Sequence, residues 1–522
     1  MDFFSHLLAI LGAVALLLLY NLWRAKHSRH KSKGRSFAPE AAGGWPIIGH
    51  LHLLSGPKTL AQTMSAMAEK HGPIFTLWLG VHRTVVISSY EAMKECFTTS
   101  DKVFASRPPS SQAKYVGYNN ANFGFAPYGA YWRDMRKLAM VELLSSNRIK
   151  ALRQIHVSEA DHLVKALFSV SRSNGNGPVK VVLDELLEHL TLNIITRMIA
   201  GKRFFDHSIE GGNGGEGHEI GELIKRFLNI MGVAVPSDLI PFTGWMDIGG
   251  TVKSMKRLAE EVDSVMENWI EEHELKRRNG GANNKSEDFI DVLLSKIEDN
   301  SAFSHDRKTI IKATTSSFIL AGADTMSIAL TWAFCNLLNN TRALKLAQEE
   351  LDLKVGKDRC VEDSDIDNLP YIQAIIKETL RLCPPGPLAV PRQATEDCYL
   401  CGYYIPKGTH LFINLWKLHR DPNTWTDPDA FVPERFLTSH ANLTVNGQNF
   451  EFLPFSGGRR ACPGTNLAMQ VMQLTLARLV HAFDFTKPSD EPVDTTLALS
   501  LALIKKTPLE VVVTPRLASQ LY

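Results

Sequence analysis

Ten residues near the C-terminus, Phe455-Ser-Gly-Gly-Arg-Arg-Ala-Cys-Pro-Gly464, constrain the fold more than any other stretch. The adjacent glycines allow a tight backbone turn, the two arginines bring fixed positive charge, and Cys462 stands just before Pro463-Gly464. An apolar-rich segment, Thr465–Phe483, follows and predicts a helix. We therefore expect Cys462 at a helix N-terminus, where free N–H groups and the helix dipole favour an anion. Such surroundings lower the pKa of a thiol, so Cys462 is a candidate thiolate ligand or nucleophile, with an inert buried cysteine as the alternative.

The composition is that of a globular protein with a large core, because 44% of the 522 residues are hydrophobic and 21% are charged. A net charge of +2 argues against nucleic acid as the main partner. The seven cysteines are an odd number scattered over a long chain and do not suggest a disulfide framework. Cys398 and Cys401 have zinc-like spacing, but no second pair lies nearby, so we assign them a structural role.

The N-terminal segment Phe3–Trp23 is almost wholly apolar. As a helix it would be ~31 Å long, enough to cross the hydrocarbon core of a bilayer. Asp2 precedes this run, whereas six basic residues follow it by Arg35. A cleaved signal peptide would carry its positive charge before the apolar run, and the positive-inside rule keeps the C-terminal side in the cytoplasm. We predict a transmembrane signal anchor at residues 1–23 and a basic, Pro- and Gly-containing linker at 24–45.

The rest of the chain shows no internal repeat and no second-domain boundary, so residues 46–522 are expected to form one mainly α-helical domain. Two strands with an intervening turn at 80–83 are predicted near its start, at Ile74–Leu79 and Thr84–Ser88. Apolar periodicity predicts further helices at Glu219–Met231, Thr251–Arg278, Lys308–Leu338 and Tyr371–Leu382.

Polar residues interrupt the apolar 308–338 helix at Ala321-Gly-Ala-Asp-Thr325. The small residues at 321–323 would let a flat ligand approach the backbone. Asp324 and Thr325 place an acid and a hydroxyl in an apolar helix, which costs free energy unless both are paired or hydrated. Thr325 could simply bond to the preceding turn. An ionised aspartate is rarely buried without a function, so Asp324 is the stronger candidate.

Two further pairs lie at helical spacing. Trp132 and Arg136 are four residues apart, so an indole N–H and a guanidinium can bind one carboxylate; an arginine beside a packed tryptophan is the alternative. Glu378 and Arg381 are three residues apart, and a surface ion pair is the simplest interpretation.

The ten-residue segment matches F-x-x-G-x-R-x-C-x-G and so resembles the haem-ligand signature of the cytochrome P-450 superfamily. Four further motifs of the chain resemble motifs of the same superfamily. The Trp132/Arg136 pair resembles its W-x-x-x-R motif, 321–325 its A/G-G-x-D/E-T motif, and Glu378–Arg381 its E-x-x-R motif. Pro433-Glu-Arg-Phe436 resembles P-E-R-F, which makes Arg435 the expected partner of a buried Glu378–Arg381 pair. The resemblance implies the cytochrome P-450 fold, a large helical domain plus a small β-sheet region, with haem b (iron protoporphyrin IX) as cofactor and residues 46–522 as a haem-thiolate monooxygenase domain.

The resemblance also implies roles for single residues. Cys462 is the expected iron ligand, and Asp324 and Thr325 are the expected proton donors of catalysis. The propionates of the haem are expected to meet Arg392, at the end of the Pro384–Arg392 connector, together with Trp132, Arg136 and Arg460. Phe455, Gly458 and Gly464 are expected to shape the loop, Gly458 by clearance and Gly464 by close helix packing. The chain departs from the pattern at Met326, where many plant members have Thr or Ser, and at Ser456-Gly457, which swaps the usual F-G-S-G order.

Electrons are expected from a separate protein, because the Gly-rich runs near 211 and 280 lack the strand that a nicotinamide- or flavin-binding turn needs. The resemblance implies NADPH–cytochrome P-450 reductase, with NADPH used only through it, and a single-pass endoplasmic reticulum protein whose catalytic domain faces the cytosol and whose anchor contacts membrane lipid. No nucleic-acid partner is expected. The alternatives are a haem-thiolate isomerase or dehydratase, which can dispense with the Asp324–Thr325 pair, and a non-catalytic haem-binding membrane protein.

Several phrases are similar to the plant A-type group, particularly family 82, whose members oxidise flavonoids, alkaloids, terpenoids and coumarins. They are Gly43–Gly49, Phe104–Pro108, Phe125–Gly129 and Leu476–Phe483. The expected pocket segments are mainly apolar and aromatic and carry no basic cluster: Lys114–Phe125, Leu228–Leu239, Leu388–Val390 and Leu499–Leu503. A small, hydrophobic, largely uncharged ring system is therefore the expected substrate.

Overall fold

The computed structural model describes residues 12, 14, 15, 34–205, 216–240, 243–279, 287–298 and 304–522. The predicted membrane anchor at 1–23 lies almost wholly outside these residues, as does the first part of the predicted linker, 24–33. The domain predicted at 46–522 lies largely inside them.

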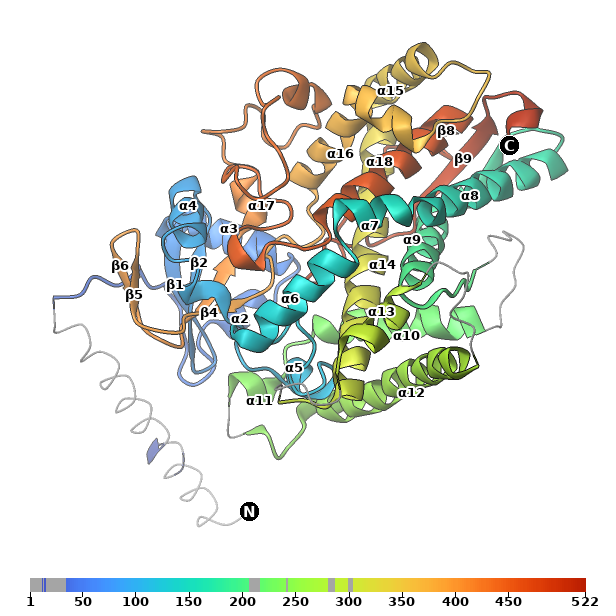
Figure 1. The fold of residues 1–522 in the computed structure, drawn as a ribbon. Coiled ribbons are helices and arrows are strands. Elements are labelled where there is room, and N and C mark those ends of the chain that lie inside the picture. The colour runs from blue at the N-terminus through green and yellow to red at the C-terminus, as the bar shows by residue number, and fades with distance from the viewer. Residues whose placement is uncertain are drawn as a thin grey trace, which may run out of the picture.

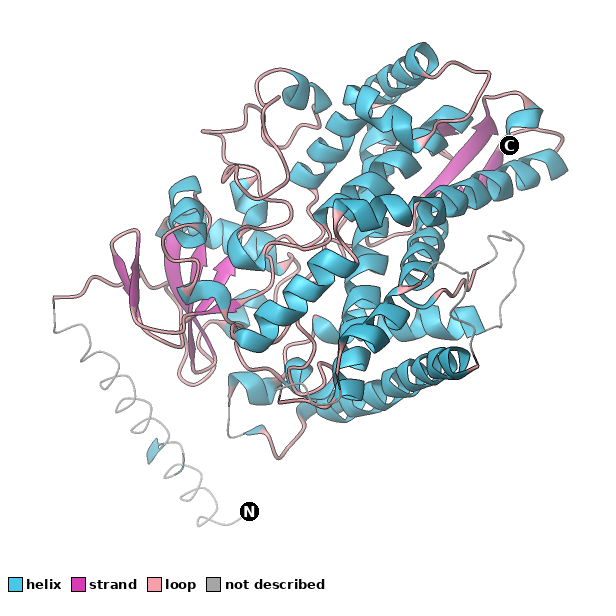
Figure 2. Ribbon diagram, viewed as in Figure 1, coloured by secondary structure: helices cyan, strands magenta, loops and turns pink. Residues whose placement is uncertain are grey.

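Helices dominate the described part of the chain (Figures 1 and 2). The α-helices are α2 (Leu51–Leu54), α3 (Leu60–His71), α4 (Tyr90–Phe97), α5 (Ser111–Tyr115), α6 (Ala130–Glu142), α7 (Ser146–Ala151), α8 (Arg153–Ser173), α9 (Leu183–Ala200), α10 (Glu216–Met231), α11 (Pro236–Leu239), α12 (Thr251–Arg278), α13 (Phe289–Lys296), α14 (Arg307–Asn339), α15 (Thr341–Lys354), α16 (Pro370–Leu382), α17 (Leu415–Leu418) and α18 (Thr465–Ala482). Short 3₁₀ helices include η2 (Val103–Ala105), η5 (Asp363–Asn368), η6 (Pro433–Leu437), η7 (Gly458–Arg460) and η8 (Ser519–Leu521).

The strands form three small sheets at the edges of the helical body (Figure 2). The largest has the order β1-β2-β7-β4, and β2 and β7 are parallel while the other neighbours are antiparallel. Its strands are β1 (Ile74–Leu79), β2 (His82–Ile87), β4 (Arg392–Gln393) and β7 (His410–Ile413). The second has the order β3-β9-β8, with β3 (Val179–Val182), β8 (Phe483–Thr486) and β9 (Glu510–Pro515), and the third is the hairpin β5 (Cys398–Leu400) and β6 (Tyr403–Ile405).

The first hairpin is tighter than predicted. Strand β1 has the predicted bounds, but β2 begins two residues earlier than expected, at His82. The turn therefore needs only Gly80 and Val81, and Gly80 takes a φ of +60° that favours glycine. A Cβ at Gly80 would also lie 2.1 Å from the carbonyl oxygen of Leu239, so glycine is required twice over.

The long helix α14 forms the centre of the helical body (Figure 1). The Asp306 side chain caps its start by accepting a hydrogen bond from Thr309 N, at 2.9 Å. Among the described residues it is the one helix long and apolar enough to cross a membrane, but 78% of its most apolar window is buried inside the protein. It is a core helix. Gly322 lies against α9, because a Cβ there would meet Ile195 Cδ1 at 2.6 Å.

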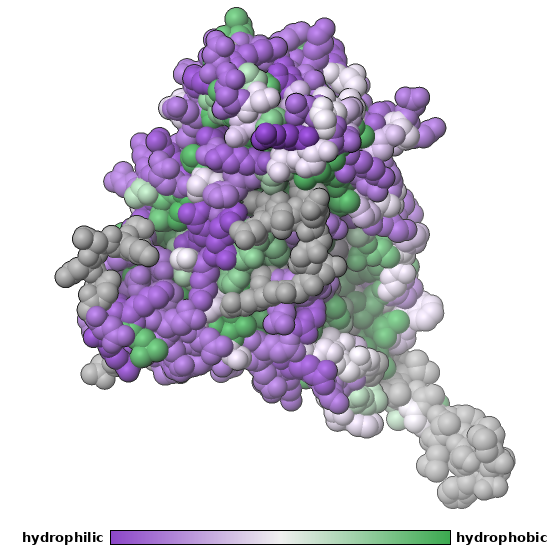
Figure 3. Space-filling model, turned by 90° about the vertical axis from the view of Figure 1, so that its right-hand side faces the viewer, coloured by the Kyte–Doolittle hydropathy of each residue, from purple (hydrophilic) through white to green (hydrophobic). Residues whose placement is uncertain are grey.

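The main hydrophobic core lies among the helices around α14, and a second cluster lies under the first sheet. The face shown in Figure 3 is mostly hydrophilic, with apolar side chains in smaller areas between. Helix α18 packs against α14 and α16, which places the segment just before it close to the centre of the molecule.

Candidate active site

The segment around Cys462 forms a compact loop that ends at helix α18. Its backbone turns at Ser456, Gly457 and Gly458 into η7. Two hydrogen bonds then close the loop, from Cys462 N to Phe455 O at 2.9 Å and from Ala461 N to Gly458 O at 3.0 Å. Helix α18 begins three residues after the cysteine. The helix N-terminus predicted beside Cys462 is confirmed.

Cys462 is exposed in this structure, so a ligand can reach the residue, although protein atoms surround its thiol densely enough to affect the pKa. Burial raises the pKa of the thiol above its ordinary value, and the N–H of Gly464, the charge of Arg136 and the Thr465 hydroxyl oppose this rise. The lowered pKa expected from the sequence is therefore wrong for the free thiol, because burial outweighs the helix N-terminus. A coordinated metal ion would deprotonate the thiol, and the same three contacts then stabilise the thiolate.

The arginines predicted to bind propionates come together near Cys462. Burial and the charges of Arg392 and Arg136 lower the pKa of Arg460 to about 9. A fourth arginine, Arg107, joins them: burial and the charges of Arg460 and Arg392 lower its pKa well below the ordinary value. Arg392 is 1% exposed, and its Nε and Nη1 atoms make no hydrogen bond with any residue that the structure describes. Buried cations with free donors are suited to a ligand that carries carboxylates.

Arg460 also connects the Cys462 loop to the backbone of residues 105–126. Its side chain donates to the carbonyl oxygens of Ala105 at 2.6 Å, Phe123 at 3.3 Å and Ala126. The Trp132 ring lies 4.3 Å from its guanidinium carbon and 5.6 Å from that of Arg136. Because three carbonyls already use much of its donor set, Arg460 offers mainly its charge to a ligand.

The predicted acid–alcohol pair occupies two sides of α14. Thr325 and Ala321 are exposed on a helix that is otherwise mostly buried, and Thr325 Oγ1 donates to Ala321 O at 2.8 Å. Burial raises the pKa of Asp324 to about 6, against the charge of Lys225 on α10. Burial also raises the pKa of Glu188 on α9, and the charge of Asp324 adds a smaller contribution. Asp324 therefore lies toward α9 and α10, as successive helix residues point about 100° apart.

The three small residues before this pair, at 321–323, lie in different surroundings, which the sequence did not predict. Ala321 is exposed, but Gly322 serves the close packing of α9 on α14 described above, and Ala323 is buried at 3%. Met326, which departs from the family pattern, is also buried at 3% and packs in the main core. Ala321 and Thr325 are the exposed residues of this stretch, whereas Gly322 and Asp324 are half-buried.

The predicted Glu378–Arg381 pair is fully buried, so the surface alternative is wrong. Arg381 Nε and Nη2 donate to the two carboxylate oxygens of Glu378, at 2.7 and 2.8 Å. Arg435 Nε donates to the same carboxylate at 3.3 Å, which confirms it as the third member. The remaining Arg381 donors reach the carbonyl oxygens of His419, Pro428 and Ala430. This cluster is closed on itself and holds α16 to η6.

Residues just outside the expected pocket segments link these segments to one another. Arg107 donates to Gly124 O at 3.1 Å and to Val390 O at 2.7 Å, which joins the second half of the first segment to 388–390. Gln112 Nε2 donates to Val233 O at 2.7 Å. Val390 and Leu499 are 50% and 69% exposed, so apolar side chains are available for a ligand. The sequence analysis missed Arg107, although the Phe104–Pro108 phrase contains it.

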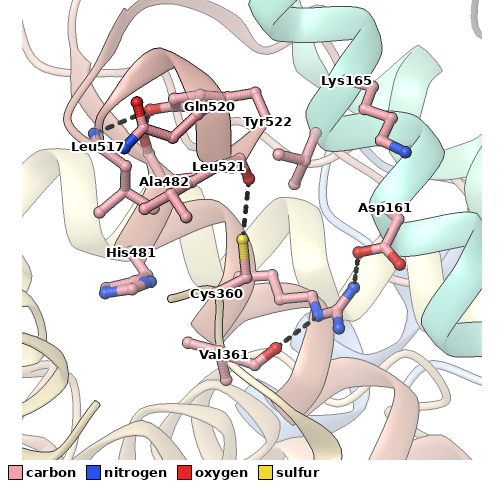
Figure 4. Close-up of a pocket in the computed structure, with 12 residues that line it drawn as sticks. Asp161, Lys165, Cys360, Val361, His481, Ala482, Leu517, Gln520, Leu521 and Tyr522 are labelled. Carbon is pink, nitrogen blue, oxygen red and sulfur yellow. Dashed lines mark hydrogen bonds and ion pairs between the residues drawn. The ribbon is translucent and has the colours of Figure 1, made fainter. Parts of the chain in front are cut away.

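A separate cavity of about 290 Å³ lies between α8, the end of α18 and the C-terminal η8 (Figure 4). Arg478, Cys360 and Tyr522 line it, and Cys360 Sγ donates to Leu521 O at 3.0 Å. Arg478 lies thirteen residues after the start of α18, which places this cavity roughly 20 Å along the helix from Cys462. It is therefore distinct from the candidate active site.

Comparison with known proteins decides the family. The family model described as cytochrome P450 matches residues 39–513. The chain belongs to the cytochrome P450 family. It is 48% identical over its full length to cytochrome P450 CYP82J17 of Trigonella foenum-graecum, with 99% of that protein covered. It is 45% identical to a flavonoid-6-hydroxylase of Mentha piperita, with both chains fully covered, and 46% identical to a strychnine-10-hydroxylase of Strychnos nux-vomica, with 98% of each covered.

The fold agrees with this cytochrome P450 assignment. A zebra fish cytochrome P450 solved with progesterone has a TM-score of 0.73 and 26% identity, and the match covers 87% of this chain and 99% of that one. Haem is the cofactor of the family. The residues present fit it, because Cys462 offers a reachable sulfur beside free, buried Arg392 donors. A Cβ at Gly464 would lie 3.8 Å from that sulfur, which is an ordinary van der Waals contact.

Proposed function

We propose that this cytochrome P450 is a membrane-anchored monooxygenase of the endoplasmic reticulum that hydroxylates a hydrophobic plant specialised metabolite. It uses O2 and electrons that NADPH supplies through NADPH–cytochrome P-450 reductase. The observation that carries the proposal is the reachable sulfur of Cys462 next to a cluster of buried arginines. Bound haem supplies the oxygen-activating chemistry, and the thiolate ligand favours O–O cleavage.

The side chains near Cys462 and on α14 have two roles in this proposal, which are to bind the haem and to supply protons. Cys462 would hold the iron, and Arg392 and Arg136 would bind the propionates, with further positive charge from Arg460, whose guanidinium lies over the Trp132 ring. Thr325 presents its hydroxyl on the accessible face of α14. Asp324, with a pKa raised to about 6, is able to hold and release a proton near neutral pH.

The substrate is a hydrophobic, largely uncharged ring system of the flavonoid, alkaloid, terpenoid or coumarin type. Two lines of support are the apolar side chains offered by the pocket segments and the names of relatives that hydroxylate a flavonoid and strychnine. Those relatives act on chemically different rings at 45% and 46% identity, so overall identity does not select among the classes. Shifts in the haem absorption of the purified protein, measured with representatives of each class, identify the class that binds.

The test of the haem-thiolate assignment is Cys462→Ala. We expect the reduced CO complex of the wild type to show the Soret band of thiolate-ligated haem and the variant to lack it, whereas the control Cys398→Ala keeps it. A thiolate-type band in the Cys462 variant contradicts the assignment. Turnover that needs neither NADPH nor reductase would instead support a haem-thiolate isomerase or dehydratase.

The membrane anchor is tested separately. Removing residues 1–23 is expected to move most of the protein from the microsomal to the soluble fraction and to leave the thiolate-type band in place. A truncated protein that stays in the membrane fraction at wild-type level contradicts residues 1–23 as the main anchor.

A further inference from the structure

The two glycines of the Cys462 loop lie directly against a distant segment of the chain. A Cβ at Gly457 would lie 2.8 Å from Phe97 Cδ2 and 3.0 Å from Phe97 Cγ. A Cβ at Gly458 would lie 2.1 Å from Asp101 Oδ1, and Gly458 also has a φ of +67°. Phe97, at the end of α4, and Asp101, four residues later, thus fill the space that side chains at 457 and 458 would need.

Asp101 is bound to the same turn by hydrogen bonds. Both of its carboxylate oxygens accept the backbone N–H of Arg459, at 3.0 and 3.1 Å. The Arg459 side chain lies 3.3 Å from one oxygen, and Arg392 Nη1 lies 3.8 Å from the other. Asp101 is only 8% exposed, and a buried carboxylate must be paired to remain charged. Its partners belong to the Cys462 loop and to Arg392.

Phe97 and Asp101 also hold Arg392. The guanidinium carbon of Arg392 lies 4.8 Å from the centre of the Phe97 ring, and Arg392 Nη2 donates to Gly457 O at 2.8 Å. Arg392 thus has the Phe97 ring, the Asp101 carboxylate and the Gly457 carbonyl as neighbours, while its Nε makes no hydrogen bond in the described part of the chain. The segment 97–101 therefore contacts the loop both directly and through Arg392.

The Phe97 contact also explains the order Ser456-Gly457. Because the Phe97 ring fills the space at position 457, glycine is the residue that fits there. Serine then stands at 456, where φ is +61°, a left-handed conformation that costs a non-glycine residue roughly 1–2 kcal/mol. Ser456 Oγ lies 3.4 Å from Arg392 Nη2, a weak hydrogen bond that offsets part of this cost.

We propose that Phe97 and Asp101 are positioning residues for haem-thiolate ligation: they fix the turn 457–459 and, through it and Arg392, the place from which Cys462 presents its sulfur. The turn is linked to the cysteine by the Ala461 N to Gly458 O bond. This inference rests on the proposed function but concerns residues outside the haem-ligand motif. A shifted turn would let the sulfur take up a proton or leave the iron, which changes the Soret band of the reduced CO complex.

The first experiment compares Asp101→Ala and Asp101→Asn with the exposed control Asp358→Ala in the haem-loaded full chain. The measurement is the rate at which the thiolate-type CO band converts to the thiol-type band at a fixed, mild urea concentration. We expect Asp101→Ala to convert at least about tenfold faster than wild type. Asn keeps an oxygen for Arg459 N but no charge, so we expect it to lie between the two.

Equal conversion rates for wild type and Asp101→Ala overturn the proposal for Asp101. The wild-type band tests the proposed function independently, so a normal band with unchanged variants rejects only this inference. If Asp101→Ala does not fold, Asp101→Asn decides alone: faster conversion supports the proposal, and an unchanged rate overturns it.

The second experiment is a double-mutant cycle between Gly457 and Phe97. Gly457→Ala alone should accelerate conversion, because the new methyl group meets the rigid ring. In the Phe97→Leu background the same change should have a several-fold smaller effect, since a leucine side chain can rotate away. Equal effects in the two backgrounds overturn the role of Phe97.

Discussion

Two groups of buried arginines differ in how completely the protein itself pairs them. Arg381 is fully buried, and its donors are used by Glu378 and by backbone carbonyl oxygens. Arg392 is equally buried, yet among the described residues its Nε makes no hydrogen bond and its Nη1 has only the Asp101 carboxylate, 3.8 Å away. Arg136 is half-buried, and the charge of Arg136 lowers the pKa of its neighbour Arg460.

This difference distinguishes arginines that stabilise the fold from arginines that are available to bind a ligand. Removing a charge from water costs several kcal/mol, so it persists only where partners repay that cost. In the Glu378 cluster the partners lie within the fold, and the cluster joins α16 to the segment around η6. Around Cys462 the arginines repel one another, and among the described residues Arg392 has the single nearby carboxylate of Asp101 as its ionic partner. We propose that the two propionates of the haem supply the further negative charge that this group needs.

The largest loss of stability is expected from breaking the buried ion-pair cluster of Glu378, Arg381 and Arg435. Arg381→Ala leaves the Glu378 carboxylate buried with Arg435 as its one remaining ionic partner at 3.3 Å. We expect the free energy of unfolding of the haem-free protein to fall by about 3–5 kcal/mol. Urea unfolding followed by far-UV circular dichroism measures it.

The matched control for Arg381→Ala is Arg420→Ala, since Arg420 pairs with the 83%-exposed side chain of Asp429. It should cost clearly less, although its bond to Leu382 O is lost as well. A loss for Arg381→Ala no larger than this control contradicts the structural role of the cluster.

The second test concerns Asp324 on α14, which is half-buried and has a raised pKa. Asp324→Asn should lower turnover by roughly 100-fold if the carboxyl supplies a proton in catalysis. Since the pKa of Asp324 is raised to about 6, wild-type turnover should change through that pH while the variant stays flat. A pH profile shared by both proteins contradicts the proposed role.

The contribution of Asp324 to the stability of the folded protein also changes with pH in a defined direction. Burial raises the pKa of Asp324 from 3.8 to about 6, so the folded protein holds this proton more tightly than the unfolded chain. The stabilisation is full below about pH 4 and is lost as pH rises through about 6. Wild type should therefore lose thermal stability relative to Asp324→Asn between pH 4 and about pH 7.

Sequence patterns predicted the elements and residues whose signals are local. Helix α12 and strand β1 have their predicted bounds, and Cys462 lies before α18 as expected. Phe97 and Asp101 were missed because their contacts with Gly457 and Gly458 cross more than 350 residues of chain. No spacing rule along the chain reports such a contact.

The roles of small residues were also hard to predict. Gly322 was expected to make room for a ligand, but it makes room for Ile195 of α9. A glycine in a helix signals close approach without saying what approaches, since a ligand and a neighbouring helix need the same space. The sign of the pKa shift at Cys462 failed for a similar reason, because burial depends on the whole fold.

The third test removes one positive charge, that of Arg136, from the group of arginines around Cys462. Arg136 makes its described contacts through charge and through the Trp132 ring, so Arg136→Gln should leave the stability of the haem-free protein unchanged or slightly raise it. We expect haem to bind about tenfold more weakly, or ~1.4 kcal/mol, measured by transfer to apomyoglobin. Arg133→Gln, on the exposed side of the same helix, is the control. Haem affinity equal to that control contradicts the binding role of Arg136.

The smallest effect is expected at a buried pair whose charge depends on pH. His273 Nδ1 lies 2.6 Å from Trp269 O and Nε2 lies 2.8 Å from Asp288 Oδ2. Both partners are acceptors, so both ring nitrogens donate and the ring is charged in this arrangement. Burial lowers the pKa of His273, but the hydrogen bond and charge of Asp288 outweigh it, and the pKa is raised overall.

Because the pKa of His273 is raised in the folded protein, the stabilisation is present below its ordinary value of 6.5 and is lost as pH rises through the raised value. Asp288→Asn keeps an oxygen to cap α13 through Asp291 N but removes the charge. We expect it to cost ~1 kcal/mol at about pH 6 and close to nothing at about pH 9, measured by urea unfolding. A pH-independent cost would place this pair with the closed Glu378 cluster, since the charge of His273 would then not be what Asp288 stabilises.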